Sequence, residues 1–548
     1  MLWYLSLRHG KRLRQILRTF ARYGLPLLSR RIPLFERLRA FIPREALRRP
    51  PQENLRLAFE ELGPTFIKIG QILSTRLDLL PEEYCRELRK LQDQAPPVDF
   101  QSIREVIEDE FKRPLEEIFP FFDPSPLASA SIAQVHRARL PEGTEVAVKV
   151  QKPGVEEVIL EDLAILEGLL RVADRLNFLE ESVPLEELFL EFRKHLLREL
   201  DFLSEAQNMR RFRENFEGFP GIVIPRVFPR YSTRRVLTSE LVEGLPLSHP
   251  NVSSLKEEDR QYFARQGIEA ILKMIFEDGL FHADPHPGNI FLRLPERELV
   301  FLDFGTVGVI DRTTQEHMVR MLFALLEKDT ERVVEILEEE FLLSPLPSPL
   351  AFRLDLSEVL ERYVARDLQE IRFESVVQEF FYLARKYRLR FPPHFSLLLR
   401  ALVVAEGTGL VLDPTFNVFP HLEGALKRIF THSMRPERIA ERLGEYALDW
   451  KEFLEHLPHR LDRLLAHTVS GKIRLQAESR DLEGMNRRLE RMSTRLALSV
   501  ILGSLLIGSS LIYTNYSQAR VLGIFGILGF AIAAFFGIAL VIEMLSHR

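Results

Sequence analysis

Residues 281–305 constrain the fold of this chain more than any other stretch. They begin FHADPHPGNIFL and, after a short polar gap, continue LVFLDFG. Apolar runs at residues 290–292 and 299–302 flank the gap and predict the two strands of a β-hairpin. Asp-Pro, His-Pro, Gly-Asn and Phe-Gly pairs supply the tight turns that hold the polar residues beside these strands. The hairpin should therefore bring one amide and two carboxylates close together.

Asp284, Asn289 and Asp303 supply those polar groups. Their oxygens suit Mg²⁺, which takes oxygen ligands and keeps positions for waters and phosphate oxygens. An Asp, an Asn five residues later and then Asp-Phe-Gly is also the spacing of a kinase catalytic loop and its metal-binding aspartate. We therefore predict that Asp284 is catalytic and that Asn289 and Asp303 bind Mg²⁺. Taken singly, each residue would more simply be a turn former.

Composition sets the remaining bounds. A chain of 548 residues should form several structural units. Helical periodicity dominates, which predicts a mostly helical α+β protein. The formal net charge of −5 argues neither for nor against nucleic acid, and we expect no nucleic-acid partner. The lone Cys85 excludes a disulfide framework and a cysteine metal site.

Residues 11–49 form a basic segment. Arginines alternate there with Leu, Ile and Phe, and only Glu36 and Glu45 oppose them. A basic amphipathic segment can lie on an anionic membrane surface. A helical arm that packs on the protein explains the same pattern, but the apolar C-terminus described below favours the membrane surface.

The next segment predicts a helix that starts at Gly63-Pro64 and ends before Pro81. Proline costs nothing in the first helical turn. Lys68 and Gln71 are three residues apart and share one face of this helix. Gly70 between them allows a close approach to the backbone, at a cost of about 1 kcal/mol in helix propensity.

A second β-containing region predicts two strands, PLASASIAQVHRARL and EVAVKVQKPG, joined by Pro-Glu-Gly. Lys149 in the second strand should point away from the core face on which Ala147 or its neighbours pack. A lysine on a strand after a small-residue loop, followed later by Asp-Phe-Gly, is the order of parts in a protein-kinase-like fold. The small-residue loop occupies the place of a phosphate-cradling glycine-rich loop. It consists of Ala128, Ser129, Ala130 and Ser131.

Residues 156–177 and 185–216 each predict a helix. The second carries Glu199, Asp201 and Glu205, and the last two are four residues apart, so both should project from one helical face. A kinase needs a helical glutamate to hold its strand lysine against the phosphates. Either Glu199 or Glu205 could hold Lys149, which leaves the other glutamate for the lysine of the earlier helix.

Residues 236–242 predict a strand that leaves the small lobe at the position of a nucleotide-binding hinge. Glu240 on this strand is therefore a candidate nucleotide contact. Helices follow from residue 315 onward, and their apolar residues at helical spacing predict the core of a large lobe. Arg400 and Glu406 stand among aliphatic residues in one of these helices, so a buried ion pair between them is a further hypothesis.

The motif HxDxxxxN before Asp-Phe-Gly is similar to that of small-molecule kinases of the aminoglycoside and choline type. Further motifs distinguish this chain from those small-molecule kinases: KIGQ, LSTRLDLLP, LQD, ASASIAQVH, ELDFLSEAQN and FHADPHPGNIF. In this order they resemble the UbiB or aarF-domain family of atypical protein-kinase-like proteins. The resemblance extends over roughly residues 55–308.

This resemblance implies a two-lobed protein-kinase-like fold that binds ATP or ADP with Mg²⁺. In that family the KxGQ helix covers the place where a peptide substrate would bind, and the proteins support isoprenoid quinone synthesis at a membrane. It also implies that Lys68 and Gln71 line the nucleotide site and that Lys68 pairs with Glu199. The expected partners are membrane lipid and quinone-biosynthesis intermediates or enzymes, and a homodimer is left open. The regulatory set would be Lys68, Gln71, Glu199, Asp201 and Glu205.

Residues 496–513 and 521–542 carry no charge and are about 18 and 22 residues long, enough to cross a bilayer core. The short turn TNYSQAR joins them, and small residues at four-residue steps permit close packing. Four arginines precede the pair, whereas the turn has only Arg520. We therefore predict an integral hairpin, and the positive-inside rule puts both of its ends in the cytoplasm. The expected location is the cell inner membrane, with a cytoplasmic catalytic domain.

Two functions from different classes fit these observations. One is a membrane-bound enzyme that uses ATP to assist quinone-lipid synthesis. The other is a nucleotide-gated scaffold for membrane enzymes that has no turnover of its own. The predicted domains are a basic arm (1–54), a KxGQ-containing helical extension (55–120), a small lobe (121–244), a helical large lobe (245–434), a charged connector (435–495) and a transmembrane hairpin (496–545).

Overall fold

The structure, a computed structural model, describes most of the chain up to residue 433. The described ranges are 2–23, 46, 48–74, 76, 79–91, 96–175, 185–327, 329–338, 348–364, 371–389, 391 and 393–433. The chain divides into two units, Met1–His432 and Ser433–Arg548. The predicted charged connector and transmembrane hairpin lie outside the described residues.

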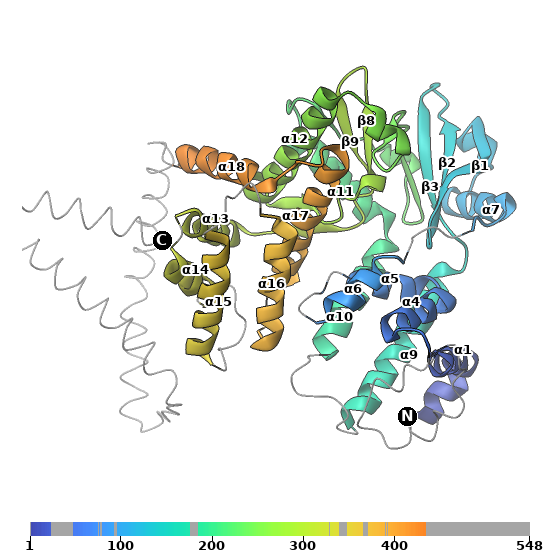
Figure 1. Ribbon diagram of the computed structural model, residues 1–548. Helices are drawn as coiled ribbons and strands as arrows, with labels where there is room; N and C mark the ends of the chain where they lie inside the picture. Colours follow the sequence, from blue (N-terminus) through green and yellow to red (C-terminus); the bar gives the residue numbers. More distant parts are fainter. Residues whose placement is uncertain are drawn as a thin grey trace, which may run out of the picture. The chain divides into compact units, whose positions relative to one another are not determined.

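An antiparallel sheet forms the small lobe (Figure 1). Val146, Val148 and Val150 share one face of it and are buried against the helix α7 (Phe100–Phe111). Because side chains alternate along a strand, Lys149 lies on the opposite face, as predicted. Ala147 shares the face of Lys149, so on β3 it is the valine neighbours of Ala147 that pack in the core. In spatial order the strands are β1 (Phe121–Ser129), β2 (Ala133–Arg139), β3 (Glu145–Gln151) and β5 (Val236–Glu240).

The Ala-rich segment is a chain reversal rather than the interior of one strand. The sequence placed this segment in a predicted strand with a small-residue loop at residues 128–131; the turn is there, but Ala128 and Ser129 still belong to β1. The backbone N–H of Ala130 donates to the carbonyl of Ala133 at 2.8 Å, which closes a turn between β1 and β2. Small side chains permit the tight turn, and the strands on its two sides pair with each other.

The predicted helix over residues 185–216 is two helices, α10 (Leu185–Glu199) and α11 (Phe202–Asn215). Asp201 breaks the helix because its backbone is extended and its carboxylate accepts a hydrogen bond from Leu203 N at 3.1 Å. A carboxylate in this position caps the start of the new helix. The expectation that Asp201 and Glu205 project from one helical face is therefore wrong.

The predicted hairpin of the large lobe is confirmed. It consists of β8 (Ile290–Arg293) and β9 (Glu298–Phe301), and Ile290 lies opposite Phe301. The hairpin belongs to a sheet with the short strands β4 (Ile222–Val223) and β6 (Leu245–Pro246). Next to it, β7 (Leu280–His282) pairs with β10 (Val307–Val309), and these two strands lead into and out of the polar loops.

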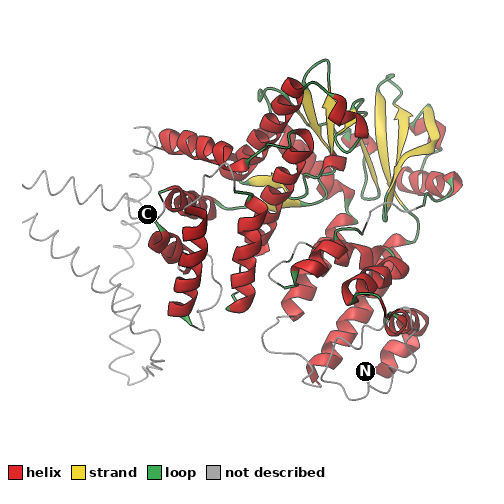
Figure 2. Cartoon of the chain, in the orientation of Figure 1, coloured by secondary structure: helices red, strands yellow, loops and turns green. Residues whose placement is uncertain are grey.

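Helices build the rest of the large lobe, in agreement with a mostly helical α+β protein (Figure 2). A long helix, α17, packs lengthwise on α12. Within α17, Phe395–Leu412 is the one stretch in the described residues with the length and mean hydropathy, 1.8, of a membrane span, and 56% of it is buried in the protein. The helices are α12 (Glu257–Lys273), α13 (Arg312–Leu326), α14 (Thr330–Ile336), α15 (Pro349–Val364), α16 (Phe373–Lys386), α17 (Pro393–Leu412) and α18 (Val418–Ser433).

The N-terminal helix α1 (Leu2–Arg22) packs on α4 (Pro51–Leu62) and α9 (Val155–Arg175). Its apolar stripe, Leu13 and Ile16, is buried in this contact. The preference for a membrane-surface arm is therefore wrong for this stripe, which packs on the protein. The exposed face keeps its basic residues Lys11, Arg14 and Arg18.

Arg12 fixes α1 in place. Its guanidinium donates to both carboxylate oxygens of the fully buried Asp162 on α9, at 2.7 and 2.8 Å. It also donates to the carbonyl of Leu62 at the end of α4, at 2.7 Å. One side chain thus joins three helices around the predicted KxGQ helix.

The predicted helix that carries KxGQ is α5 (Pro64–Leu73), and it ends seven residues earlier than the expected boundary before Pro81. Gly63 separates it from α4 with a backbone φ of +93°, a conformation that favours glycine. The helix α6 (Glu82–Leu88) follows and packs against both α4 and α5. The shorter α5 contacts α9 and α10 and carries Lys68 to Glu199 at the end of α10.

Candidate active site

Lys149 and Glu205 form an ion pair between β3 and α11. The ammonium lies 3.0 and 2.8 Å from the two carboxylate oxygens of Glu205, and the side chains are 22% and 7% exposed. The ring of Phe202 lies 5.3 Å from the same ammonium. The sequence left the partner of Lys149 open between Glu199 and Glu205, and the structure places Glu205 there.

Asp303 approaches this pair from the large lobe, with its Oδ1 atom 3.6 Å from Lys149 Nζ. Burial opposes the charge of Lys149, but the carboxylates of Glu205 and Asp303 outweigh it and raise the lysine pKa. The lysine in turn holds the pKa of Asp303 well below its ordinary value. Burial raises the pKa of Glu205, yet two short contacts to one ammonium are the geometry of an ionised pair.

The backbone of Asp303 has a φ of +57°, in the left-handed region that non-glycine residues rarely adopt. Its carboxylate accepts a hydrogen bond from Gly305 N at 3.3 Å. A strained backbone of this kind persists where the surroundings impose it, often at functional sites. The turn directs the carboxylate toward Lys149 on the other lobe.

A second ion pair joins Lys68 of α5 to Glu199 at the end of α10, with an N–O distance of 3.1 Å. The side chains are 13% and 17% exposed. This is the pairing that the family resemblance implied. The positive charge of Lys68 also contributes to the lowered pKa of Asp303, so α5 belongs electrostatically to the site.

Gly70 and Gln71 pack α5 against the residues that follow α6. Gln71 donates to the carbonyl of Leu91 at 3.3 Å. The close approach that Gly70 was expected to allow is made by the side chains of Leu91 and Phe59, which lie where a Cβ atom of residue 70 would stand. Gln71 therefore holds the position of α5, and Lys68 is the member of the motif whose charge reaches the site.

His282 orders the loop that follows β7. It is fully buried, its Nε2 lies 3.0 Å from the carbonyl of Leu302, and its Nδ1 lies 3.1 Å from Asp284 N. Burial lowers its pKa, so the imidazole is neutral at neutral pH. The carbonyl of Asn289 accepts from Leu302 N at 2.8 Å, which places Asn289 beside the residue that precedes Asp303. The long-range contacts of the hairpin thus gather Asp284, Asn289 and Asp303.

The structure brings a further residue to the site, because Arg400 of α17 donates to Asp284 Oδ1 at 3.0 Å. The predicted ion pair between Arg400 and Glu406 is wrong. Residues six apart on a helix point to different faces, so the spacing itself was a signal against the pair. Glu406 instead accepts the backbone N–H groups of Phe373 and Glu374, at 2.9 and 3.0 Å, and caps the start of α16.

The remaining predicted residues lie on strands and turns of the small lobe. Ala128 and Ser129 end β1, and Ala130 and Ser131 form the turn. Ser129 Oγ is buried without a hydrogen-bond partner in the described part of the chain. Glu240 ends β5, and its carboxylate accepts from Arg226 N at 3.2 Å, which commits that side chain to a backbone contact.

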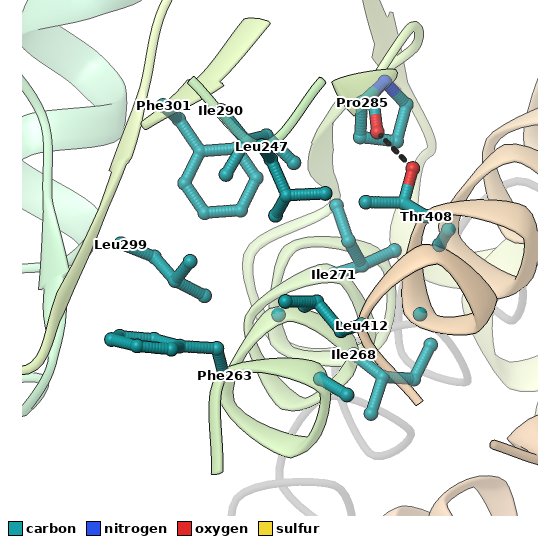
Figure 3. Close-up of a pocket in the computed structure, with 14 residues that line it drawn as sticks. Leu247, Phe263, Ile268, Ile271, Pro285, Ile290, Leu299, Phe301, Thr408 and Leu412 are labelled. Carbon is teal, nitrogen blue, oxygen red and sulfur yellow. Dashed lines mark hydrogen bonds between the residues drawn. The ribbon is translucent and has the colours of Figure 1, made fainter. Parts of the chain in front are cut away.

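A small apolar cavity of about 20 Å³ lies next to Pro285 in the loop after β7, between α12, the β8–β9 hairpin and α17 (Figure 3). This volume is roughly that of one water molecule, and the apolar walls offer a water few partners. We regard it as a packing gap rather than a ligand site. At its edge, Thr408 Oγ1 donates to the carbonyl of Pro285 at 2.9 Å.

The two lobes, the strand lysine with its helical glutamate and the Asp-Phe-Gly turn define a kinase-like protein. Residues 90–337 match the family model of the ABC1 atypical kinase-like domain. Residues 356–417 match the UbiB helical domain, and residues 480–546 match the ABC1/UbiB kinase-like C-terminal domain. The chain belongs to the ABC1/UbiB family of atypical kinase-like proteins, which confirms the resemblance seen in its motifs.

Relatives align with most of the chain. A protein of Xanthomonas campestris pv. campestris named "Probable protein kinase UbiB" is 33% identical over 530 residues, 92% of this chain and 94% of that protein. The uncharacterized protein sll0095 of Synechocystis sp. is 31% identical over 501 residues, 88% of this chain and 86% of that protein. The solved complex of Rv3197 with erythromycin, from Mycobacterium tuberculosis, is 26% identical with a TM-score of 0.47, and covers 64% of this chain and 90% of that one.

Proposed function

We propose that this protein is a membrane-bound atypical kinase-like ATPase that supports the synthesis of ubiquinone-type isoprenoid quinones. It would bind ATP with Mg²⁺ and act on lipid intermediates, or help to extract them, rather than phosphorylate peptides. One observation carries the proposal: Lys149 is held by Glu205 while Asp303 stands 3.6 Å away on the other lobe. This arrangement is the one that phosphoryl transfer requires of a kinase-like fold.

The donor set supports Mg²⁺ beside the phosphates. Asn289 and Asp303 offer an amide oxygen and a carboxylate, and the Asn289–Leu302 hydrogen bond brings them together. In the described residues no group of three or more His, Cys, Asp or Glu side chains gathers. Two protein ligands suit Mg²⁺, which completes its shell with phosphate oxygens and waters. When bound, the ion would neutralise charge that develops between the β- and γ-phosphates.

The protein's own residues would do the positioning. Lys149 would contact the phosphates, with its charge maintained by Glu205. The turn of the Ala-rich loop would lie against the nucleotide, where the unpaired Ser129 Oγ offers a hydrogen-bonding group. Asp284 would orient the hydroxyl or water that accepts the phosphoryl group, a role that needs geometry more than a strong base.

The position of α5 argues against a peptide acceptor. This helix reaches the site through the Lys68–Glu199 ion pair. The positive charge of Lys68 also helps to lower the pKa of Asp303. An extended peptide would have to displace α5 and break a pair that is little exposed. Water, a lipid or a small molecule would not. The relatives named UbiB and the charge-free predicted spans at residues 496–513 and 521–542 favour a lipid-linked role at a membrane.

The test is phosphate release by the full-length protein, with and without liposomes and a phenolic mimic of a quinone precursor. Asp303→Asn should lower the rate by about 10²-fold or more, because it removes a charged metal ligand. Asp99→Asn is the matched control: Asp99 caps α7 far along the chain from the site, and Asn caps equally well. Wild-type release by Asp303→Asn would overturn the metal assignment. Nucleotide binding without release in any condition would favour the scaffold.

The membrane part of the proposal has its own test. A chain that ends before Arg495 should lose resistance to carbonate washing while it keeps nucleotide binding. Residual binding to anionic vesicles through Lys11, Arg14 and Arg18 should decrease with salt, because exposed charges are screened over about 8 Å at physiological ionic strength. A truncated chain that withstands both high salt and carbonate would show that the anchor lies elsewhere.

A further inference from the structure

The catalytic loop carries no lysine or arginine of its own. Between Asp284 and Asn289 the sequence is Pro-His-Pro-Gly. His286 is exposed, and its Nδ1 accepts a hydrogen bond from Gly288 N at 2.9 Å, so its ring is committed to its own turn. A loop that must hold a carboxylate beside an anionic phosphate therefore needs a cation from another part of the chain.

Arg400 supplies that cation from the middle of α17, 116 residues further along the chain. Its guanidinium lies 3.0 Å from Asp284 Oδ1, and the two side chains are 22% and 33% exposed. Among the described residues, Arg400 is the cation with which Asp284 forms an ion pair. The contact joins one guanidinium nitrogen to one carboxylate oxygen, so the second carboxylate oxygen stays available for an acceptor group.

A second contact of α17 holds the backbone of the same loop. Thr408, eight residues after Arg400 and buried, donates to the carbonyl of Pro285 at 2.9 Å. Eight residues are a little over two helical turns, so both side chains can face the loop. Figure 3 shows the Thr408–Pro285 bond at the edge of the apolar gap. Helix α17 thus binds the side chain of Asp284 through Arg400 and the backbone carbonyl of Pro285 through Thr408.

We propose that Arg400 is a positioning residue that orients the Asp284 carboxylate for the acceptor, and that α17 thereby makes the catalytic loop depend on the helical region. The inference rests on the proposed function for its catalytic consequence. Its structural part, that Arg400 orders the loop, stands independently. A misplaced catalytic group can cost about 10²-fold in rate even when the nucleotide still binds.

Four single variants and one double variant separate this role from a merely structural one. Arg400→Met removes the cation but keeps the apolar stem, and Arg400→Lys keeps a charge without the fork. Arg353→Met is the matched control, because Arg353 pairs with Glu338 in the same helical region and away from the loop. Asp284→Asn, alone and combined with Arg400→Met, completes a double-mutant cycle.

The first readout is phosphate release with Mg²⁺ and ATP. Arg400→Met should lower kcat by about 10²-fold while the KM for ATP changes less than about threefold, since Lys149 and Asp303 still hold the nucleotide. Arg400→Lys should recover part of the loss, and Arg353→Met should be unchanged. In the Asp284→Asn background, Arg400→Met should have almost no further effect. The proposal would be overturned if the two substitutions lowered kcat independently, so that their effects multiplied in the double variant. A faster rate in Arg400→Met would overturn it as well.

The second readout is hydrogen exchange of residues 282–289 without nucleotide, which needs no turnover. Arg400→Met should exchange there at least about fivefold faster than wild type, while residues 145–151 of β3 stay unchanged. Unchanged exchange in the loop would refute the positioning role. Faster exchange in the loop together with no phosphate release by wild type would refute the proposed ATPase and leave the Arg400–Asp284 contact established.

Discussion

Gly70 gives a sharp test of how α5 is packed, because one methyl group there sets two opposing effects against each other. A Cβ atom at residue 70 would lie 2.3 Å from Leu91 Cδ1 and 2.7 Å from Phe59 Cδ2. Carbon atoms in contact prefer about 3.5–4.0 Å, so both neighbours would have to move. They are 4% and 6% exposed, and the core around them leaves little space for that movement.

The relative size of the helix-propensity gain and the overpacking cost decides whether Gly70→Ala stabilises or destabilises the protein. Replacing a helical glycine by alanine favours the helix by about 1 kcal/mol. Overpacking a well-filled core costs about 1–3 kcal/mol, and two contacts this close place Gly70→Ala in the upper part of that range. We expect a net destabilisation of about 1–2 kcal/mol. Gly407 on α17 is the matched control: it has nothing within 4 Å of its Cβ position, so Gly407→Ala should stabilise by up to about 1 kcal/mol.

The assay compares thermal and denaturant midpoints of both variants with those of wild type. Gly70→Ala should lower both midpoints and speed hydrogen exchange in residues 64–73, because displacement of Leu91 also weakens its bond with Gln71. Gly407→Ala should raise the midpoints. If the two substitutions shift the midpoints in the same upward direction, the packing of Leu91 and Phe59 against α5 is wrong.

Three further predictions concern other contacts. Glu205→Gln should lower nucleotide affinity by at least about tenfold in equilibrium binding, because Lys149 then turns to Asp303; unchanged affinity would contradict the role of the pair. Arg12→Met strands the fully buried Asp162 and should cost about 3–5 kcal/mol in unfolding experiments, whereas exposed Arg14→Met should cost almost nothing. Burial lowers the pKa of His136, so the unfolded chain takes up a proton first as pH falls below about 6.5. The thermal midpoint should therefore fall from pH 7.5 to 5.5, with a smaller slope in His136→Gln; an equal slope would refute the assignment.

Local sequence determined the elements whose information lies within a few residues. The β8–β9 hairpin follows from two short apolar runs and a polar gap, and Lys149 leaves the core face because strand side chains alternate. The spacing of Asp284, Asn289 and Asp-Phe-Gly fixed the class of site for the same reason. Such features need only short-range geometry, so a single sequence is enough to predict them.

The tertiary structure decided which distant residues pair where the sequence left the partner open. Lys149 meets Glu205 across 56 residues, Asp284 meets Arg400 across 116, and Arg12 meets Asp162 across 150. Asp201 was equally plausible in a helix and at its start, and only the break between α10 and α11 assigns it to the cap. The apolar stripe of α1 could have faced a membrane or a protein, since both remove the same surface from water. The amphipathic pattern and the charges of a segment show which side chains need burial or an ionic partner. Which group provides the burial or the partner depends on how distant segments pack together.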